Sequence, residues 1–171
     1  MRISGNRQLK RRLTVLLTVV LTVPLLTSGH DHLSLLDQAQ QRGSMTLLTR
    51  NGASSYFIGP DGGTGPEYDL AAAFAEYLGI SIEVRVANEF GDLGTLLNSG
   101  QGELIGANLT RTPAREQLFN FGPDYAETKT VVIYKRGTTR PRELSDLLGK
   151  RLSVIAGSSY ESQLETARAS L

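Results

Sequence analysis

The residues best suited to binding chemistry are Arg115 and two polar residues before it. Asn108 and Thr110 lie seven and five residues upstream of this arginine. A guanidinium matches both oxygens of a carboxylate, and such a pair contributes about 2 to 3 kcal/mol in a partly dry cleft. The amide and hydroxyl could meet a ligand's other polar atoms. Spacing alone leaves an alternative open, in which Arg115 is a surface arginine paired with Glu116 or Glu103.

Two further groups of residues could complete such a site. Tyr56 or Phe57 could form an aromatic wall, although either could equally belong to a strand core. Ser158 and Ser159 lie at the start of a predicted helix, where free amides and the helix dipole favour an anion. Ser158 and Glu161 also have capping-box spacing, so simple helix capping is the alternative.

No pattern for catalysis, for a metal or for a cofactor stands out in the sequence. Both histidines, His30 and His32, precede the predicted fold, which argues against a Ser/His/Asp triad. The chain has no cysteine for a thiolate zinc site. Its glycines match neither a phosphate loop nor a dinucleotide fingerprint. We therefore expect no catalytic residue, no metal and no cofactor.

Composition places the chain among ordinary globular proteins. It has 171 residues, 40% of them hydrophobic and 20% charged, which excludes collagen, coiled coil and general disorder. Residues 1–29 hold five basic groups and no acidic one, and the rest of the chain has 13 basic and 17 acidic groups. This acidic body, with 6% aromatic residues and no tryptophan, argues against a nucleic-acid partner.

The first 29 residues have the three parts of a secretory signal. A basic stretch to Arg12 precedes an apolar run over residues 13–26 and small polar residues at 27–29. Fourteen helical residues rise about 21 Å, which is short of a hydrocarbon core of about 30 Å. We expect a signal peptide over 1–29 and export of the remainder, with an uncleaved anchor as the alternative. Residues 30–44 are expected to be a linker with a short helix.

The body of the chain alternates between strand and helix patterns. Apolar spacing predicts strands at 45–50, 80–86 and 103–107, with helices around 70–78 and 90–97. Such alternation favours a mainly parallel sheet covered by helices, an α/β fold. Asp61 and Gly62 are typical of a hairpin turn. Residues 45–136 are thus predicted to form a first lobe.

Residues 137–171 are predicted to be a hinge and the beginning of a second lobe. Lys135 to Arg142 interrupt the pattern with glycine, proline and four basic residues, after a β-branched strand at 130–134. A short helix at 144–148, a strand at 152–155 and a helix from Ser159 follow. Because this segment lacks a core of its own, we expect an incomplete lobe; packing onto the first lobe is the alternative.

Four stretches resemble the bacterial extracellular solute-binding proteins of family 3. They are GPEYDL at 65–70, ELIGANLTRTPAR at 103–115, FGPDY at 121–125 and LLGKRLSVIAGSSY at 147–160. The resemblance implies a two-lobed, type II periplasmic-binding-protein-like fold, with the first lobe largely present and the second truncated. It also implies that Arg115, Thr110 and Asn108 lie on a ligand-contacting loop, and that the ligand is a small anion such as an amino acid.

Residues 47–79 and 131–160 further resemble the binding domains of the lytic murein transglycosylase F subgroup. That resemblance implies a periplasmic sensor of murein peptides or amino acids that is peripheral to the outer membrane. Full-length members carry a C-terminal lysozyme-like domain that acts on peptidoglycan. Here Glu161 and Ser162 reproduce only two residues of its catalytic signature, so enzyme activity is left open. The alternatives are a fragment of an active transglycosylase and a transporter-linked amino-acid carrier. Asn108 stands where this subgroup usually has glycine.

Overall fold

The computed structural model describes residues 33–170, and the residues from Ser34 onward form one unit by their contacts. The predicted signal peptide at 1–29 and both histidines lie outside the described residues. In the described part no helix has the length and apolar character needed to cross a bilayer. The same residues contain no cluster of three or more histidine, aspartate or glutamate side chains that could hold a metal ion.

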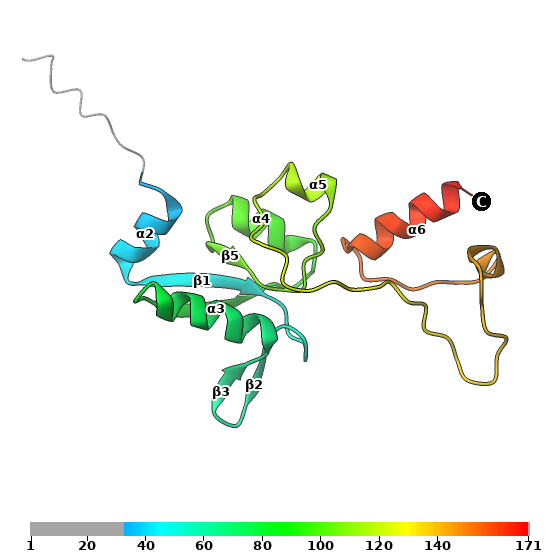
Figure 1. Cartoon of the computed structure of the whole chain (residues 1–171), viewed down its shortest axis with the longest axis horizontal. Helices are drawn as coiled ribbons and strands as arrows, with labels where there is room; N and C mark the ends of the chain where they lie inside the picture. The colour runs from blue at the N-terminus through cyan, green and yellow to red at the C-terminus, as the bar shows by residue number, and fades with distance from the viewer. Residues whose placement is uncertain (1–32, 171) are drawn as a thin grey trace, which may run out of the picture. The chain divides into compact units, whose positions relative to one another are not determined.

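The elements follow the order predicted for the first lobe (Figure 1). They are α2 (Leu35–Arg42), β1 (Ser44–Thr49), β2 (Phe57–Gly59), β3 (Gly62–Thr64), α3 (Pro66–Tyr77), β4 (Ser81–Val86), α4 (Asp92–Asn98), β5 (Leu104–Ile105), α5 (Pro113–Glu116), the 3₁₀ turn η1 (Leu144–Leu147) and α6 (Ser159–Ala169).

Helix α2 leads directly into the central strand. Ser34 begins the helix with a capping box, because its hydroxyl accepts from the Asp37 amide while the Asp37 carboxylate accepts from the Ser34 amide. Gly43 ends it with φ of 74°, a left-handed conformation that glycine adopts without strain. The predicted short helix before the first strand is therefore confirmed.

Three parallel strands in the order β4-β1-β5 form the sheet, which confirms the predicted βαβαβ arrangement. β1 pairs with β4 over six residues and with β5 at Leu47 and Leu48, and both leucines are fully buried. Strands β2 and β3 form a separate antiparallel hairpin whose turn is Pro60 and Asp61, one residue before the predicted Asp61 and Gly62, because Gly62 already belongs to β3 and pairs with Gly59.

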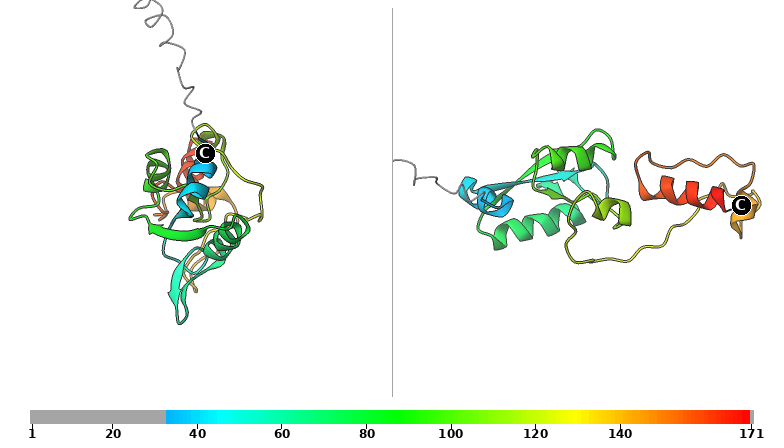
Figure 2. Two further views of the ribbon diagram at one scale, coloured as in Figure 1. Left: turned by 90° about the vertical axis from the view of Figure 1, so that its left-hand side faces the viewer. Right: turned by 90° about the horizontal axis from the view of Figure 1, so that it is seen from above.

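The two faces of the sheet carry different helices (Figure 2). Leu48 on one face packs with Leu93 of α4, whereas Met45 on the other packs with Ala75 of α3. The helix predicted around 70–78 forms as α3, but Leu70 and Phe74 are exposed and Ala71 and Ala75 are buried in their place. Both sets recur every four residues, but only the small alanines allow the helix to approach the sheet closely.

Two predicted strands are absent from the sheets of the structure. Residues 130–134 and 152–155 have no strand assignment, and Val131, Ile133 and Ile155 are 74%, 92% and 55% exposed. Their β-branched pattern predicts an extended backbone, but a strand also needs a neighbour for its ladder, and the described residues supply none. The predicted helix at 144–148 forms as the 3₁₀ turn η1.

Candidate functional site

Asn108, Thr110 and Arg115 follow the carboxyl end of β5, one of the three parallel strands. Loops leave β1 at residues 50–56, β4 at 87–91 and β5 at 106–112. In open α/β sheets this edge is where ligands bind, because loops diverge there and leave a crevice. Thr49 closes the floor beneath these loops, where its buried hydroxyl donates to the Gly106 carbonyl over 2.6 Å.

Asn108 ties the loop after β5 to the loop after β1. Its backbone has φ of 53°, the left-handed region, and its side-chain amide donates to the Ser54 carbonyl, the Ser54 hydroxyl and the Ser55 hydroxyl at 2.9 to 3.0 Å. Its backbone amide donates to Glu67 Oε1 over 2.9 Å. The glycine-like conformation is thus retained by an asparagine, a residue that tolerates it better than most.

Arg115 lies at the end of the same loop. Its Nη1 donates to the Thr110 carbonyl over 2.8 Å and its Nη2 to the Gly157 carbonyl over 3.1 Å, while the guanidinium carbon stands 5.5 Å from the Phe90 ring centre. A guanidinium has five N–H donors, so three remain beyond these two bonds. Thr110 contacts Arg115 through its backbone carbonyl, and the predicted contact of its hydroxyl with a ligand stays a prediction.

The alternative partners of Arg115 are engaged elsewhere. Glu103 accepts from Arg42 over 2.9 Å and from the Thr46 amide over 2.8 Å. Glu116 accepts from Arg111 over 3.2 Å. Burial lowers the pKa of Arg115 from its ordinary value, with no neighbouring anion to offset the effect. Among the described residues, Arg115 is therefore a partly buried cation without a carboxylate partner.

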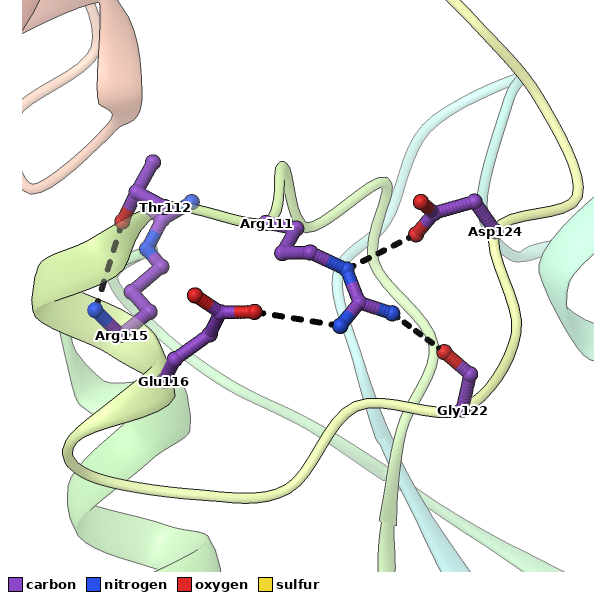
Figure 3. Close-up of polar contacts among 6 residues, drawn as sticks. All are labelled: Arg111, Thr112, Arg115, Glu116, Gly122 and Asp124. Atoms are coloured by element: carbon purple, nitrogen blue, oxygen red, sulfur yellow. Dashed lines mark hydrogen bonds and ion pairs between the residues drawn. The ribbon is translucent and has the colours of Figure 1, made fainter.

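Arg111 is a structural residue that the sequence did not single out (Figure 3). Its guanidinium lies between Glu116 and Asp124 and also donates to the Gly122 carbonyl over 2.6 Å. Hydrogen bonds to Asp124 and then to Glu116 raise the pKa of Arg111 above its ordinary value. The short helix α5 follows closely after Arg111. Thr112 caps its start, because the Thr112 hydroxyl accepts from the Arg115 amide. Arg111 thus holds the loop that presents Arg115.

The start of α6 lies beside Arg115. Ser158 and Ser159 are buried, at 7% and 5% exposure, and a Cβ on Gly157 would come within 2.9 Å of Gly91 Cα. This approach, together with φ of 73° at Gly157, requires glycine. The N-terminus of α6 is therefore adjacent to the guanidinium, as the predicted anion site requires.

The predicted capping box of α6 was wrong. The Ser158 hydroxyl donates to the Ile155 carbonyl over 2.6 Å and caps no amide of the helix. The Glu161 carboxylate instead accepts from the Gly157 amide over 2.8 Å, one residue before the predicted position. An internal carboxylate therefore already occupies part of this helix start.

Tyr56 lies on the hairpin side of the site. Its ring packs against Tyr68 with 5.5 Å between centroids, and it contacts Gly63 so closely that a Cβ there would meet it at 2.8 Å. Phe57 is 42% exposed. Neither residue touches Arg115 in the described part of the chain, so the structure brings the loop and the serines to Arg115 but leaves the aromatic wall apart.

Glu67 is a second residue that sequence reasoning missed. It lies in the first turn of α3, is 6% exposed, and accepts from both the Asn108 amide and the Tyr125 hydroxyl. Burial and then the bond to Glu67 raise the pKa of Tyr125 above its ordinary value. The sequence signal for this buried carboxylate is weak, because it consists only of a charged residue at a position of α3 that faces the core.

A hollow of about 370 Å³ opens at the end of β4, and its lining includes Arg85, Asn88, Asp92 and Thr95. None of the predicted site residues lines it.

Comparison with known proteins gives consistent results. Residues 49–164, more than half of the chain, match the bacterial extracellular solute-binding proteins, family 3. A membrane-bound lytic murein transglycosylase F from Ectopseudomonas mendocina is 38% identical over 139 residues, covering 81% of this chain and 28% of that protein. The Vibrio vulnificus protein of that name is 44% identical over 113 residues, or 66% and 21% of the two chains. The chain thus spans about a quarter of the length of these relatives.

Solved structures agree on the fold. An ancestral arginine-binding protein bound to arginine has a TM-score of 0.69 and 27% identity, covering 75% of this chain and 57% of that one. The arginine-bound form of truncated ArgBP from T. maritima has a TM-score of 0.68 at 24% identity, covering 76% and 62%. The two-lobed, type II periplasmic-binding-protein-like fold predicted from sequence is confirmed, with one lobe represented in part. By its fold and its sequence, the chain belongs to the bacterial extracellular solute-binding proteins of family 3.

Proposed function

We propose that this chain is an exported ligand-binding domain that holds the carboxylate of an amino acid or murein peptide through Arg115. The observation that carries the proposal is the state of this guanidinium. It is partly buried, three of its donors remain available, and no carboxylate of the described residues neutralises it. A cation in this condition gains more from a bidentate anion than a solvated surface arginine would.

The surroundings of Arg115 support an anion at this position. The start of α6 at Ser158 and Ser159 lies next to the guanidinium, and its amides favour an anion, although the Glu161 carboxylate accepts from the Gly157 amide there. Asn108 keeps its amide oxygen available for a ligand donor, since its three described side-chain bonds all use the nitrogen. Tyr56 and Thr110 belong to the proposed site through their loops.

The relatives suggest the biological setting. They carry the name of a membrane-bound lytic murein transglycosylase, so we propose that this domain senses cell-wall fragments in the periplasm and controls an attached peptidoglycan-cleaving domain. Lobe closure on the ligand would shift the population toward one state of the enzyme. Glu161 is not proposed as a catalytic acid, because it serves the start of α6.

Calorimetric titration of the full chain with free amino acids and murein peptides tests the proposal. Arg115→Ala should weaken binding at least tenfold, and Arg115→Lys, which keeps the charge but loses the fork, should weaken it less. Arg85→Ala is the matched control, because this solvent-facing arginine bonds only Gln101 among the described residues. Circular dichroism checks that each variant is folded. Equal affinity of the parent and both folded Arg115 variants would remove Arg115 from the site.

A further inference from the structure

Glu67 is a buried carboxylate that the proposed contact with a ligand does not use. It is 6% exposed in the first turn of α3 and makes no ion pair among the described residues. A carboxylate loses its hydration on burial, so hydrogen bonds must replace the lost water. Two donors do so here, because the Asn108 backbone amide and the Tyr125 hydroxyl both donate to the same oxygen, Oε1. Each bond has an ionised acceptor and is therefore stronger than a bond between neutral groups.

Close packing fixes the position of Glu67 at the start of α3. The Tyr68 amide donates to the Ser55 carbonyl over 3.2 Å, and a Cβ on Gly65 would come within 2.5 Å of the same oxygen. A Cβ on Gly106 would come within 3.4 Å of Glu67 Oε2. The start of α3 is thus packed against the loop after β1, and the carboxylate is packed against the loop after β5.

The bond to Asn108 fixes the backbone of a residue in the proposed ligand site. The Asn108 side chain is already held by Ser54 and Ser55. The bond from its backbone amide to Glu67, over 2.9 Å, holds the residue at a second point. The amide oxygen of Asn108 therefore has a defined direction before a ligand arrives, which lowers the ordering cost of binding.

The bond to Tyr125 ties the same carboxylate to residues 120–130, which we call the outgoing segment. This segment follows the loop after β5 and belongs to no helix or strand, so side-chain contacts fix its position. Arg111 holds it at Asp124, and Glu67 holds it at Tyr125. Movement of the outgoing segment therefore changes the hydrogen bonding of the carboxylate that positions the loop after β5.

We infer that Glu67 is a positioning residue of the ligand site and makes ligand affinity depend on the position of the outgoing segment. Glu67 acts through Asn108 and touches no ligand itself. The inference rests on the proposed function, because it concerns the regulation of the same site. By linkage, a ligand that binds better when Tyr125 is bonded to Glu67 must stabilise that bonded state by the same factor.

The direction of the effect separates positioning from charge repulsion. A carboxylate beside an anion site disfavours an anionic ligand, so removal of its charge alone should tighten binding. Loss of positioning should weaken binding instead. Glu67→Gln removes the charge but keeps an oxygen that can accept from both donors, whereas Glu67→Ala removes the charge and the acceptor.

Calorimetric titration of the full chain tests the inference, with L-arginine, L-glutamate and a murein tripeptide as probes. L-arginine is included because solved neighbours hold it. Tyr125→Phe should weaken binding about fivefold, at the lower end of the range for coupled sites. Glu67→Ala should weaken binding further, because it also releases the Asn108 amide. Glu67→Gln should lie between the parent and Glu67→Ala, because an amide oxygen is a weaker acceptor than a carboxylate.

Tyr77→Phe and Glu76→Gln are the matched controls, because both residues lie on α3 and neither side chain bonds a described residue. Both controls should bind like the parent. Tyr125→Phe removes only a hydroxyl from a residue that is 65% exposed, so it tests the inference even where Glu67→Ala fails to fold. Hydrogen exchange gives a second measurement, in which ligand should slow exchange of the amides of 121–125 in the parent and less so in Tyr125→Phe.

Two results would overturn the inference while the proposed function stands. The first is parent-like affinity in the folded Tyr125→Phe variant, and the second is tighter binding by both Glu67 variants. In either case Arg115→Ala would still weaken binding. Failure of the parent to bind any of the three probes, or equal binding by Arg115→Ala, would instead defeat the proposed function and this inference with it.

Discussion

Two arginines four positions apart show how partners decide the role of a residue. Arg111 is neutralised by Glu116 and Asp124 and organises its loop, whereas Arg115 contacts only carbonyl oxygens and an aromatic ring. Sequence separation hides this difference, because Asp124 and Gly157 lie 13 and 42 residues from the arginines that they contact. The residue types of the site were predictable from the sequence, but the pairing of its charges was not.

Asn108 should tolerate glycine better than alanine. Both substitutions remove the three bonds to Ser54 and Ser55, but alanine must also adopt φ of 53°, which costs about 1 to 2 kcal/mol for a residue with a Cβ. Urea denaturation should therefore show Asn108→Ala to be less stable than Asn108→Gly by about 1 kcal/mol. A glycine variant less stable than the alanine variant would contradict this account.

Tyr125 should make the fold sensitive to alkaline pH. Because its pKa is raised in the folded state, the unfolded chain releases this proton first, near pH 10, and binds fewer protons above that value. The contribution of protonated Tyr125 to the stability of the fold is therefore complete below pH 10. It is lost as the pH rises through the pKa of Tyr125 in the folded state. Tyr125→Phe should remove this part of the decline in urea denaturation between pH 9 and 11. Tyr160→Phe, whose hydroxyl bonds no described residue, should retain it.

The elements predicted correctly are those whose apolar periodicity is clear and whose packing partner is close in the sequence. β1, β4 and α4 combine a clear apolar period with a nearby neighbour, and the structure forms all three. The buried face of α3 was not predictable from periodicity, because Ala71 and Ala75 have the same spacing as Leu70 and Phe74, and packing distance selects between them. The strands at 130–134 and 152–155 were wrong because propensity specifies an extended backbone while ladder formation depends on a partner.

The contact between Gly157 and Gly91 should control where α6 begins. Gly157→Ala places a Cβ within 2.9 Å of the Gly91 backbone, so the loop before α6 must move away from Arg115. Gly149→Ala is the matched control, because its φ of 70° is nearly the same and its Cβ meets nothing within 4 Å. Thermal unfolding should show that Gly149→Ala lowers the free energy of unfolding by about 1 kcal/mol, because of its positive φ alone. Gly157→Ala should lower it by a further 1 to 3 kcal/mol, roughly, because of the added steric contact. Equal losses would mean that the contact contributes nothing.

At the scale of the whole chain, packing is uneven between its two parts. The buried apolar side chains all lie between Ala39 and Ala107 in the described residues, around β1. Beyond residue 117 large side chains such as Val131, Ile133 and Ile155 are exposed. Stability should therefore follow burial rather than secondary-structure propensity, because backbone hydrogen bonds resist exchange only where the surrounding core must open first.

Native-state hydrogen exchange measures this difference directly. Amides of Leu47 and Leu48 should be among the slowest, since both residues are fully buried and paired with neighbouring strands. Amides of 130–134 and 152–155 should exchange at nearly unprotected rates, because their backbone has no ladder. The segment 159–169 should be intermediate, since α6 has its own helical bonds but few buried side chains. Protection of 130–134 equal to that of β1 would contradict this expectation, because it would mean that the segment is paired in solution.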